Sequence, residues 1–240
     1  MSSGDAKSGE SKRKQTRYAV SDDCRLKASI LVRSSDEGTE TRDWSGTLVD
    51  LSATGAHIQI SLAAVAYQGD GCTLKLTHGG RKAEVRGFLA HYVCSARYST
   101  CGVQFDFGYG GTGEKAYEPF LKAIIASTTL KAGETGTEPG RYREEYNGPG
   151  GIKLVVWRDN KPERAIVAFD YAMARYAAAL NGAGPDMIQN KAQVTFRAVA
   201  AGGSLTAEQV ADARWEFSLA ASNLPKTIPP DIRRFLRLVS

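Results

Sequence analysis

Asp50-Leu51-Ser52-Ala53-Thr54-Gly55 separates two runs that have the character of β-strands, Trp44–Val49 and Ala56–Ile60. In the second run Ala56, Ile58 and Ile60 share one face, while His57 and Gln59 lie on the other. Aspartate, serine and glycine favour tight turns, because the short polar side chains bond to nearby backbone and glycine adopts unusual dihedral angles. The stretch therefore predicts a polar corner between two strands.

Further short β-type runs surround this corner. One run precedes it, Lys27–Val32, and three follow it, Cys72–Leu76, Ala83–Val93 and Cys101–Phe107. Thr77–Arg81 contains two glycines and predicts a hairpin between two of these runs. Six short strands separated by turn signals predict a small antiparallel β-barrel rather than a parallel α/β sheet.

An amphipathic helix is expected after the barrel. Its apolar stripe follows helical spacing and comprises Tyr117, Phe120, Leu121, Ile124 and Ile125. Pro119 is expected in the first turn, where its missing N–H is tolerated. The preceding Gly108–Gly113 lacks the Gly-Lys-Ser/Thr ending of a phosphate-binding loop, so we interpret it as a flexible hinge.

The rest of the chain is expected to be mainly helical. Ile152–Trp157 is strand-like, but the alanine-rich Glu163–Leu180 favours a helix that ends at Asn181-Gly182. Thr206–Gln209 resembles a capping box at the start of a second helix. A last helix after Pro229-Pro230-Asp231 carries the apolar stripe Ile232, Phe235, Leu236 and Val239, opposite Arg233, Arg234 and Arg237.

These patterns predict a β plus α organisation in four parts. Residues 1–12 form a disordered basic tail, and residues 13–130 form the six-stranded barrel domain with its helix. Residues 131–150, rich in Gly, Thr, Glu and Pro, form a linker. Residues 151–240 form a mainly helical region in which we recognise no family.

Composition is that of an ordinary globular protein, with 42% apolar and 24% charged residues in 240. Met1–Gln15 lacks the apolar segment of a signal peptide, and no run reaches the roughly 18 apolar residues of a membrane span. We therefore expect a cytoplasmic protein without a transmembrane segment.

Cysteines and histidines form no pattern that indicates a metal. The four cysteines, Cys24, Cys72, Cys94 and Cys101, lack CxxC spacing, and the three histidines stand at no ligand spacing from them. We expect reduced cysteines that are buried as small apolar side chains, Cys94 included. Neither a metal nor a cofactor is expected.

Ser52 has no histidine and acid at a recognisable spacing, so we expect no enzyme activity.

Positive charge is concentrated at the start of the chain. The net charge is +5, and residues 1–17 carry five basic against two acidic residues, a local balance of +3. Such an arm suits nucleic acid, an acidic membrane surface or a phosphorylated small ligand, and it also suits a solvated tail. No basic stripe interleaved with aromatic residues follows it, so we expect neither DNA nor RNA as partner.

Two arginines of the arm and the polar corner together suit a guanine nucleotide. Arg13 and Arg17 offer planar forks that bind phosphate or the O6/N7 edge of guanine with two parallel hydrogen bonds. Asp50 can accept from the two adjacent donors of guanine, and Ser52 can donate to phosphate. Gly55 permits close backbone approach or a positive φ. The alternative is a turn whose side chains only cap their own backbone.

Three segments resemble the motifs of the PilZ domain family: Arg13-Lys14-Gln15-Thr16-Arg17-Tyr18, Asp50–Ala56 and Gly102–Phe105. The resemblance covers about residues 12–126. It implies a six-stranded barrel that binds the bacterial second messenger cyclic di-GMP in the cytoplasm. In it Arg13 and Arg17 would grip guanine and phosphate, Asp50, Ser52 and Gly55 would line the opposite wall, and Gly102–Phe105 would belong to the core.

The expected function is therefore that of a cyclic di-GMP receptor that changes conformation or partner contacts on binding, in processes such as motility, biofilm formation or virulence. The helical C-terminal region would contact a protein partner or a second copy. The alternative is a nucleotide-independent adaptor of a motility or secretion machine.

Overall fold

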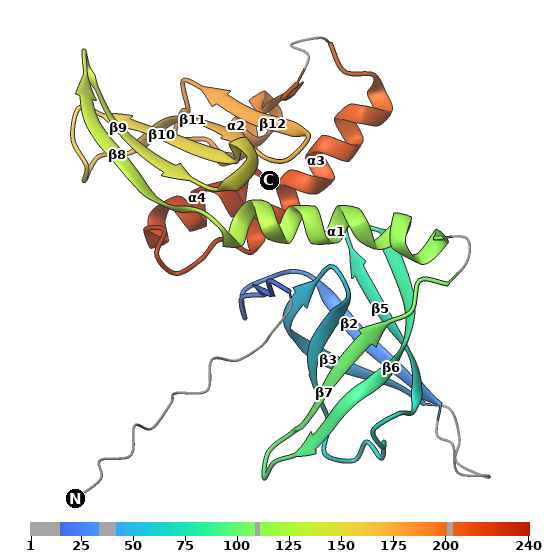
Figure 1. Cartoon of the computed structure of the whole chain (residues 1–240). Helices are drawn as coiled ribbons and strands as arrows, with labels where there is room; N and C mark the ends of the chain where they lie inside the picture. The colour runs from blue at the N-terminus through green and yellow to red at the C-terminus, as the bar shows by residue number, and fades with distance from the viewer. Residues whose placement is uncertain (1–14, 34–41, 109–110, 201–203) are drawn as a thin grey trace, which may run out of the picture.

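The computed structural model describes residues 15–33, 42–108, 111–200 and 204–240. Within them the chain forms two antiparallel sheets, and helix α1 (Thr112–Thr128) lies between them (Figure 1). Tyr117, Phe120 and Ile124 of α1 belong to the core of the first sheet, whereas Ala126 belongs to that of the second. One helix thus contributes to both cores.

The first sheet is a closed six-stranded barrel. Its strands are β2 (Lys27–Arg33), β3 (Arg42–Ser52), β4 (Gly55–Ile60), β5 (Gly71–His78), β6 (Arg81–Cys94) and β7 (Ser99–Phe105). They pair antiparallel in the order β3-β2-β5-β6-β7-β4, and pairing of β3 with β4 closes the ring. A two-residue strand, β1 (Tyr18–Ala19), adds to β3. The prediction of a six-stranded antiparallel barrel followed by a helix is confirmed. The prediction that Pro119 lies in the first turn of that helix is wrong, because α1 begins at Thr112 and Pro119 lies inside it.

Alternating apolar residues build the barrel interior. Ile30, Ile58, Leu74 and Val85 are fully buried and come from four different strands. Cys72 and Cys101 are also buried, as expected. Cys24 is half-buried, and Cys94 is exposed, so the prediction of burial is wrong for Cys94. The pairing of β6 with β7 shifts register between Leu89 and His91, and most of β6 beyond this bulge is exposed.

The second sheet is a six-stranded meander, so the prediction of a mainly helical C-terminal region is wrong. Its strands are β8 (Lys131–Glu138), β9 (Arg141–Asn147), β10 (Lys153–Asp159), β11 (Ile166–Ala172), β12 (Tyr176–Asn181) and β13 (Thr195–Ala198). They follow one another in sequence order from one edge to the other. A 3-10 turn, η1 (Pro149–Gly151), precedes β10, and three helices complete the region: α2 (Met187–Gln193), α3 (Ala207–Ser222) and α4 (Pro230–Val239).

The expected helix at Glu163–Leu180 is instead the hairpin of β11 and β12. Alanine favours helices only weakly, and tertiary pairing overrides that preference. Ala177 and Ala178 are buried in β12, where they pair with Ala172 and Tyr171 of β11. Gly182, expected to end a helix, has a φ of +72° and follows the end of β12. A left-handed glycine ends either element, so it did not distinguish them.

The expected linker at 131–150 is an ordered hairpin of β8 and β9. Lys131–Glu138 is the edge strand of the sheet and is almost entirely exposed. An exposed edge strand has no apolar face to bury, so its composition resembles that of a linker. Gly140, with a φ of +74°, lies in the turn between the two strands.

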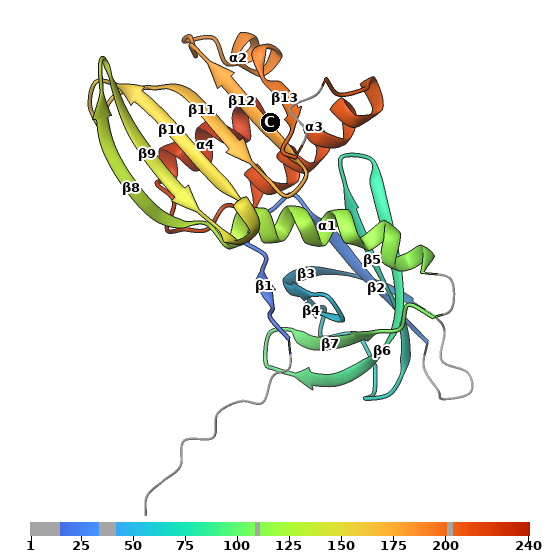
Figure 2. The same cartoon turned by 45° about the horizontal axis from the view of Figure 1, so that its top comes forward.

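Two of the expected helices are confirmed. α3 begins with a complete capping box between Thr206 and Gln209. α4 buries its predicted stripe of Ile232, Phe235, Leu236 and Val239. Both helices pack on one face of the second sheet (Figure 2). None of the helices in the described ranges combines the length and apolar character that a bilayer crossing requires.

Helix α3 also joins the two sheets. The Trp215 indole lies among barrel core residues and donates to the backbone carbonyl of His78 at 2.8 Å. After α3, the Asn223 side chain accepts from the backbone N–H of Ser21 at 2.7 Å and donates to the Thr128 hydroxyl at 2.9 Å. The segment that enters the barrel is thus bonded both to α1 and to the end of α3.

Candidate functional site

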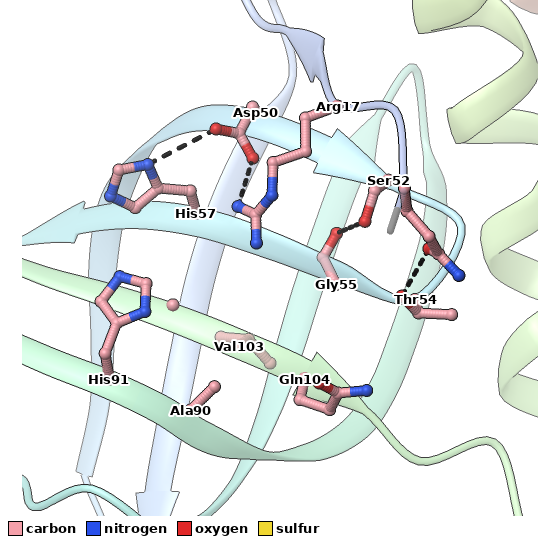
Figure 3. Close-up of a pocket in the computed structure, with 12 residues that line it drawn as sticks. Arg17, Asp50, Ser52, Thr54, Gly55, His57, Ala90, His91, Val103 and Gln104 are labelled. Carbon is pink, nitrogen blue, oxygen red and sulfur yellow. Dashed lines mark hydrogen bonds and ion pairs between the residues drawn. The ribbon is translucent and has the colours of Figure 1, made fainter. Parts of the chain in front are cut away.

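A hollow of about 630 Å³ opens on the barrel beside the predicted corner (Figure 3). Four elements surround it: the segment before β1, the β3–β4 corner, the middle of β6 and strand β7. The lining residues are Gln15, Arg17, Asp50, Ser52, Thr54, Gly55, His57, Ala90, His91, Gly102, Val103 and Gln104. Four of the five predicted ligand-binding residues are therefore together. The fifth, Arg13, lies outside the described residues.

Asp50 is the electrostatic centre of the hollow. One carboxylate oxygen accepts from Arg17 Nη1 at 2.9 Å, and the other lies 3.5 Å from His57 Nδ1. The Arg17 side chain extends towards the carboxylate, and His57 lies on its other side (Figure 3). Asp50 and His57 face each other because β3 and β4 pair there after a register shift. The Arg17 side chain is 35% exposed and that of Asp50 is 19% exposed, so a ligand can reach both.

The described part of the arm is held on the barrel. Thr54 donates from its hydroxyl to the Gln15 amide oxygen at 2.6 Å. Tyr18 and Ala19 pair with Leu51 and Asp50 of β3. The backbone that follows Arg17 is therefore paired with β3, and the side chain of Gln15 is bonded to the corner. These contacts hold the arm where the Arg17 guanidinium meets Asp50.

Helix α1 supports the corner from the core side. The Tyr117 hydroxyl donates to the backbone carbonyl of Ser52 at 2.8 Å. Burial raises the pKa of Tyr117, and the nearby charge of Asp50 raises it further. Ser52 is 3% exposed, and its hydroxyl donates to the backbone carbonyl of Gly55 at 3.2 Å. Ser52 thus caps its own turn as observed, and donation to phosphate requires rotation of the hydroxyl.

Gly55 is required by close packing. Its φ is not positive, so freedom to adopt a left-handed backbone conformation is not the reason for glycine here. A Cβ at Gly55 would lie 2.5 Å from the carbonyl oxygen of Val103. Any larger residue would push β4 away from β7 and open the barrel beside the hollow.

Several lining residues were not predicted as site residues. His57 lines the hollow. The alternation of its strand predicted that it faces away from the barrel core, and no other indication of its position was present in the sequence. His91 lies over Gly102, where a Cβ would be 1.9 Å from the imidazole, and its ring centroid is 5.8 Å from that of His57. Gly102 and Gln104 line the hollow as well, so β7 contributes to this wall and not to the core alone.

The arrangement is suited to binding. A guanidinium, a carboxylate, two imidazoles and two amides surround an open hollow, and together they offer donors and acceptors to a charged, planar ligand. Within the described ranges, no three His, Cys, Asp or Glu side chains are grouped so that they could hold a metal ion. The Ser52 hydroxyl donates to the backbone carbonyl of Gly55 and not to a side chain that could act as a general base.

Comparison with known families agrees with the geometry. A family model described as the PilZ domain matches residues 11–115, and no curated protein sequence matches the chain. The match begins before the described arm and ends inside α1, so it includes all six barrel strands and the whole hollow. Residues 11–115 of this chain form a PilZ domain.

Proposed function

We propose that this protein is a non-catalytic receptor for cyclic di-GMP and that the hollow beside Asp50 binds the dinucleotide. The observation that supports this most is the convergence of Arg17, Asp50 and Gly55 around a hollow of about 630 Å³ in a PilZ domain. Hollows of roughly 300–1,000 Å³ accommodate ligands of this scale. Arg13 is assigned to the site by its motif position alone.

Each side chain has a defined part in the proposal. Arg17 grips a phosphate or the guanine edge, because its fork forms two parallel hydrogen bonds. Asp50 accepts from the adjacent ring N–H and amine of guanine. Since Arg17 and Asp50 pair at 2.9 Å without ligand, the dinucleotide replaces or extends this contact. If the dinucleotide replaces the contact, its binding free energy includes the loss of one partly exposed ion pair.

Contacts of the arm supply a route to the C-terminal region. Four residues beyond Arg17, the backbone of Ser21 donates to Asn223 after α3. Asp23 lies 3.7 Å from Arg233 and 3.2 Å from Arg237 on α4. Any displacement of the arm by the dinucleotide thus acts on both helices, and a change in partner contacts follows from this connection.

Isothermal titration calorimetry with cyclic di-GMP tests the proposal. We expect binding by the wild-type chain, and a loss of about 1–3 kcal/mol in Arg17→Ala and in Asp50→Ala, the scale of a lost charged hydrogen bond. Lys82→Ala is the matched control, because this exposed lysine lies on β6 outside the hollow. Absence of heat at tens of micromolar ligand would refute the proposal.

One observation favours the alternative of a nucleotide-independent adaptor. Arg17, Asp50 and Ser52 already satisfy one another or their own backbone without ligand. If the protein is such an adaptor, calorimetry detects no heat of binding, and cyclic di-GMP leaves the hydrogen exchange of the arm unchanged.

A further inference from the structure

A second hollow, of about 740 Å³, lies in the C-terminal region. Its walls are α4, the connection between β10 and β11, and the loop that precedes α2. We call it the α4 groove. The argument uses six of its lining residues: Arg164, Ile166, Met187, Arg234, Phe235 and Leu238. It lies outside the residues matched by the PilZ family model.

The α4 groove has an apolar surface that the described chain leaves uncovered. Leu238 in the last turn of α4 is 47% exposed, although the buried stripe of the same helix is packed against the sheet. Phe235 and Ile166 are nearly buried and form apolar walls, and Met187 is half-buried at the start of α2. Covering such side chains removes apolar surface from water and favours association.

The walls of the groove are fixed to one another by Arg158. Its side chain is 5% exposed and donates to Asp231 of α4 at 2.5 Å and to the backbone carbonyl of Arg164 at 3.2 Å. It also pairs with Glu144 of β9. This guanidinium is therefore neutralised within the fold and connects β9, β10 and α4. The groove is formed before any partner binds.

Two other guanidiniums of the α4 groove are not neutralised. Arg164 and Arg234 are exposed, and neither forms an ion pair with any residue in the described ranges. By contrast, Arg233 and Arg237 of the same helix lie within 3.7 Å and 3.2 Å of Asp23. Apart from Asp231, the only acidic residue that lines the groove is Glu163. The groove therefore combines apolar walls with an excess of positive charge.

We propose that the α4 groove binds a short segment of a partner protein that carries aliphatic side chains beside carboxylates. Arg164 and Arg234 come from different walls, the strand connection and the helix, so a chain with several side chains can meet both at once. The aliphatic side chains cover Leu238 and Phe235, and the carboxylates pair with the two guanidiniums. This site is proposed whether or not the barrel binds the dinucleotide.

The test begins with a random 12-residue peptide library displayed on phage and selected on the wild-type chain. Counter-selection uses the triple variant Arg164→Gln, Arg234→Gln, Leu238→Ser, whose three positions are exposed and leave Arg158 in place. An enriched peptide is then synthesised with a fluorescent label and titrated by anisotropy. Lys82→Gln is the control variant, and thermal melting shows that every variant is folded.

We expect enriched peptides with at least one aliphatic residue and one acidic residue. Their affinity should fall about tenfold or more in the triple variant and stay unchanged in Lys82→Gln. Hydrogen exchange should show protection of α4 by the peptide. The proposal is overturned by failure to enrich any peptide over the triple variant, by a basic or purely apolar consensus, or by protection that leaves α4 unchanged. It is also overturned if laurate protects α4 while no peptide is enriched, since a small carboxylate is then the ligand.

Discussion

Replacement of Asn223 by alanine tests the connection between the barrel and the C-terminal region. Asn223 is 1% exposed, and its side-chain oxygen accepts from the Ser21 backbone N–H at 2.7 Å. Its amide nitrogen donates to the hydroxyls of Ser127 and Thr128, both at 2.9 Å. The amide nitrogen also donates to the backbone carbonyl of Ala19 at 3.4 Å. Truncation removes all four bonds without placing a new group in the interface.

The magnitude follows from which groups keep a partner. The Ser127 hydroxyl still donates to the carbonyl of Ile124 at 3.0 Å, and that of Thr128 still donates to the carbonyl of Ala19 at 2.9 Å. The Ser21 N–H loses its acceptor, the side-chain oxygen of Asn223. An unsatisfied N–H costs about 1–3 kcal/mol when buried, and that of Ser21 is partly buried. Together with the other lost bonds, we expect the free energy of unfolding to fall by about 2–3 kcal/mol. For a chain of this size the melting temperature should fall by about 5–10 °C.

The assay is thermal unfolding followed by circular dichroism, with hydrogen exchange at the Ser21 amide as a local measure. Asn181→Ala is the matched control, because Asn181 is exposed at the end of β12. It should melt within about 1–2 °C of the wild type. If Asn223→Ala melts with this control and Ser21 exchanges as in the wild type, Asn223 does not join the two halves as described.

Two further predictions concern titratable groups. Hydrogen bonding to Ser99 lowers the pKa of exposed Cys94, whereas burial raises the pKa of Cys72 to about 12 and of Cys101 to about 11. Iodoacetamide at pH 7.5 should therefore alkylate Cys94 first, and earlier labelling of Cys72 or Cys101 by peptide mapping would contradict this. Burial raises the pKa of Glu216, although Arg175 Nη2 lies 3.6 Å from its carboxylate and acts in the opposite direction. The contribution of Glu216 to stability is therefore present at low pH and is lost as pH rises through the raised folded pKa. Glu216→Gln should raise the free energy of unfolding by roughly 1–3 kcal/mol at pH 8 and by less at pH 5, and an equal effect at both pH values in urea titrations would exclude this origin.

The barrel and part of its site were predictable because their signals are local. Alternation in Ala56–Ile60 indicated which side chains face inward, and the core confirmed it. The turn predicted at Asp50–Gly55 lies between two strands as expected, because turn chemistry depends on neighbouring residues. It is shorter than predicted, since β3 extends to Ser52 and β4 begins at Gly55, which leaves Ala53 and Thr54 as the turn. His91 and Gln104 could not be predicted as site residues, because only pairing of β6 with β7 and of β7 with β4 brings them beside Asp50.

The C-terminal region was mispredicted where local preference and tertiary pairing disagree. Alanine at positions 177 and 178 favours a helix, yet hydrogen bonding to β11 makes both residues part of a strand. Ala178 is in addition buried in the core to which α3 contributes. The caps of α3 and the stripe of α4 involve contacts within a few residues, and there the prediction was confirmed.

The sequence alone thus determined the strand alternation, the polar corner, the motif of the arm and the two terminal helices, since each depends on residues close together in the chain. The tertiary structure decided the second sheet, the walls of the hollow and the attachment of the arm to Asn223. Ser21 and Asn223 are 202 positions apart, and the energy of such a contact exists only when the whole chain is folded.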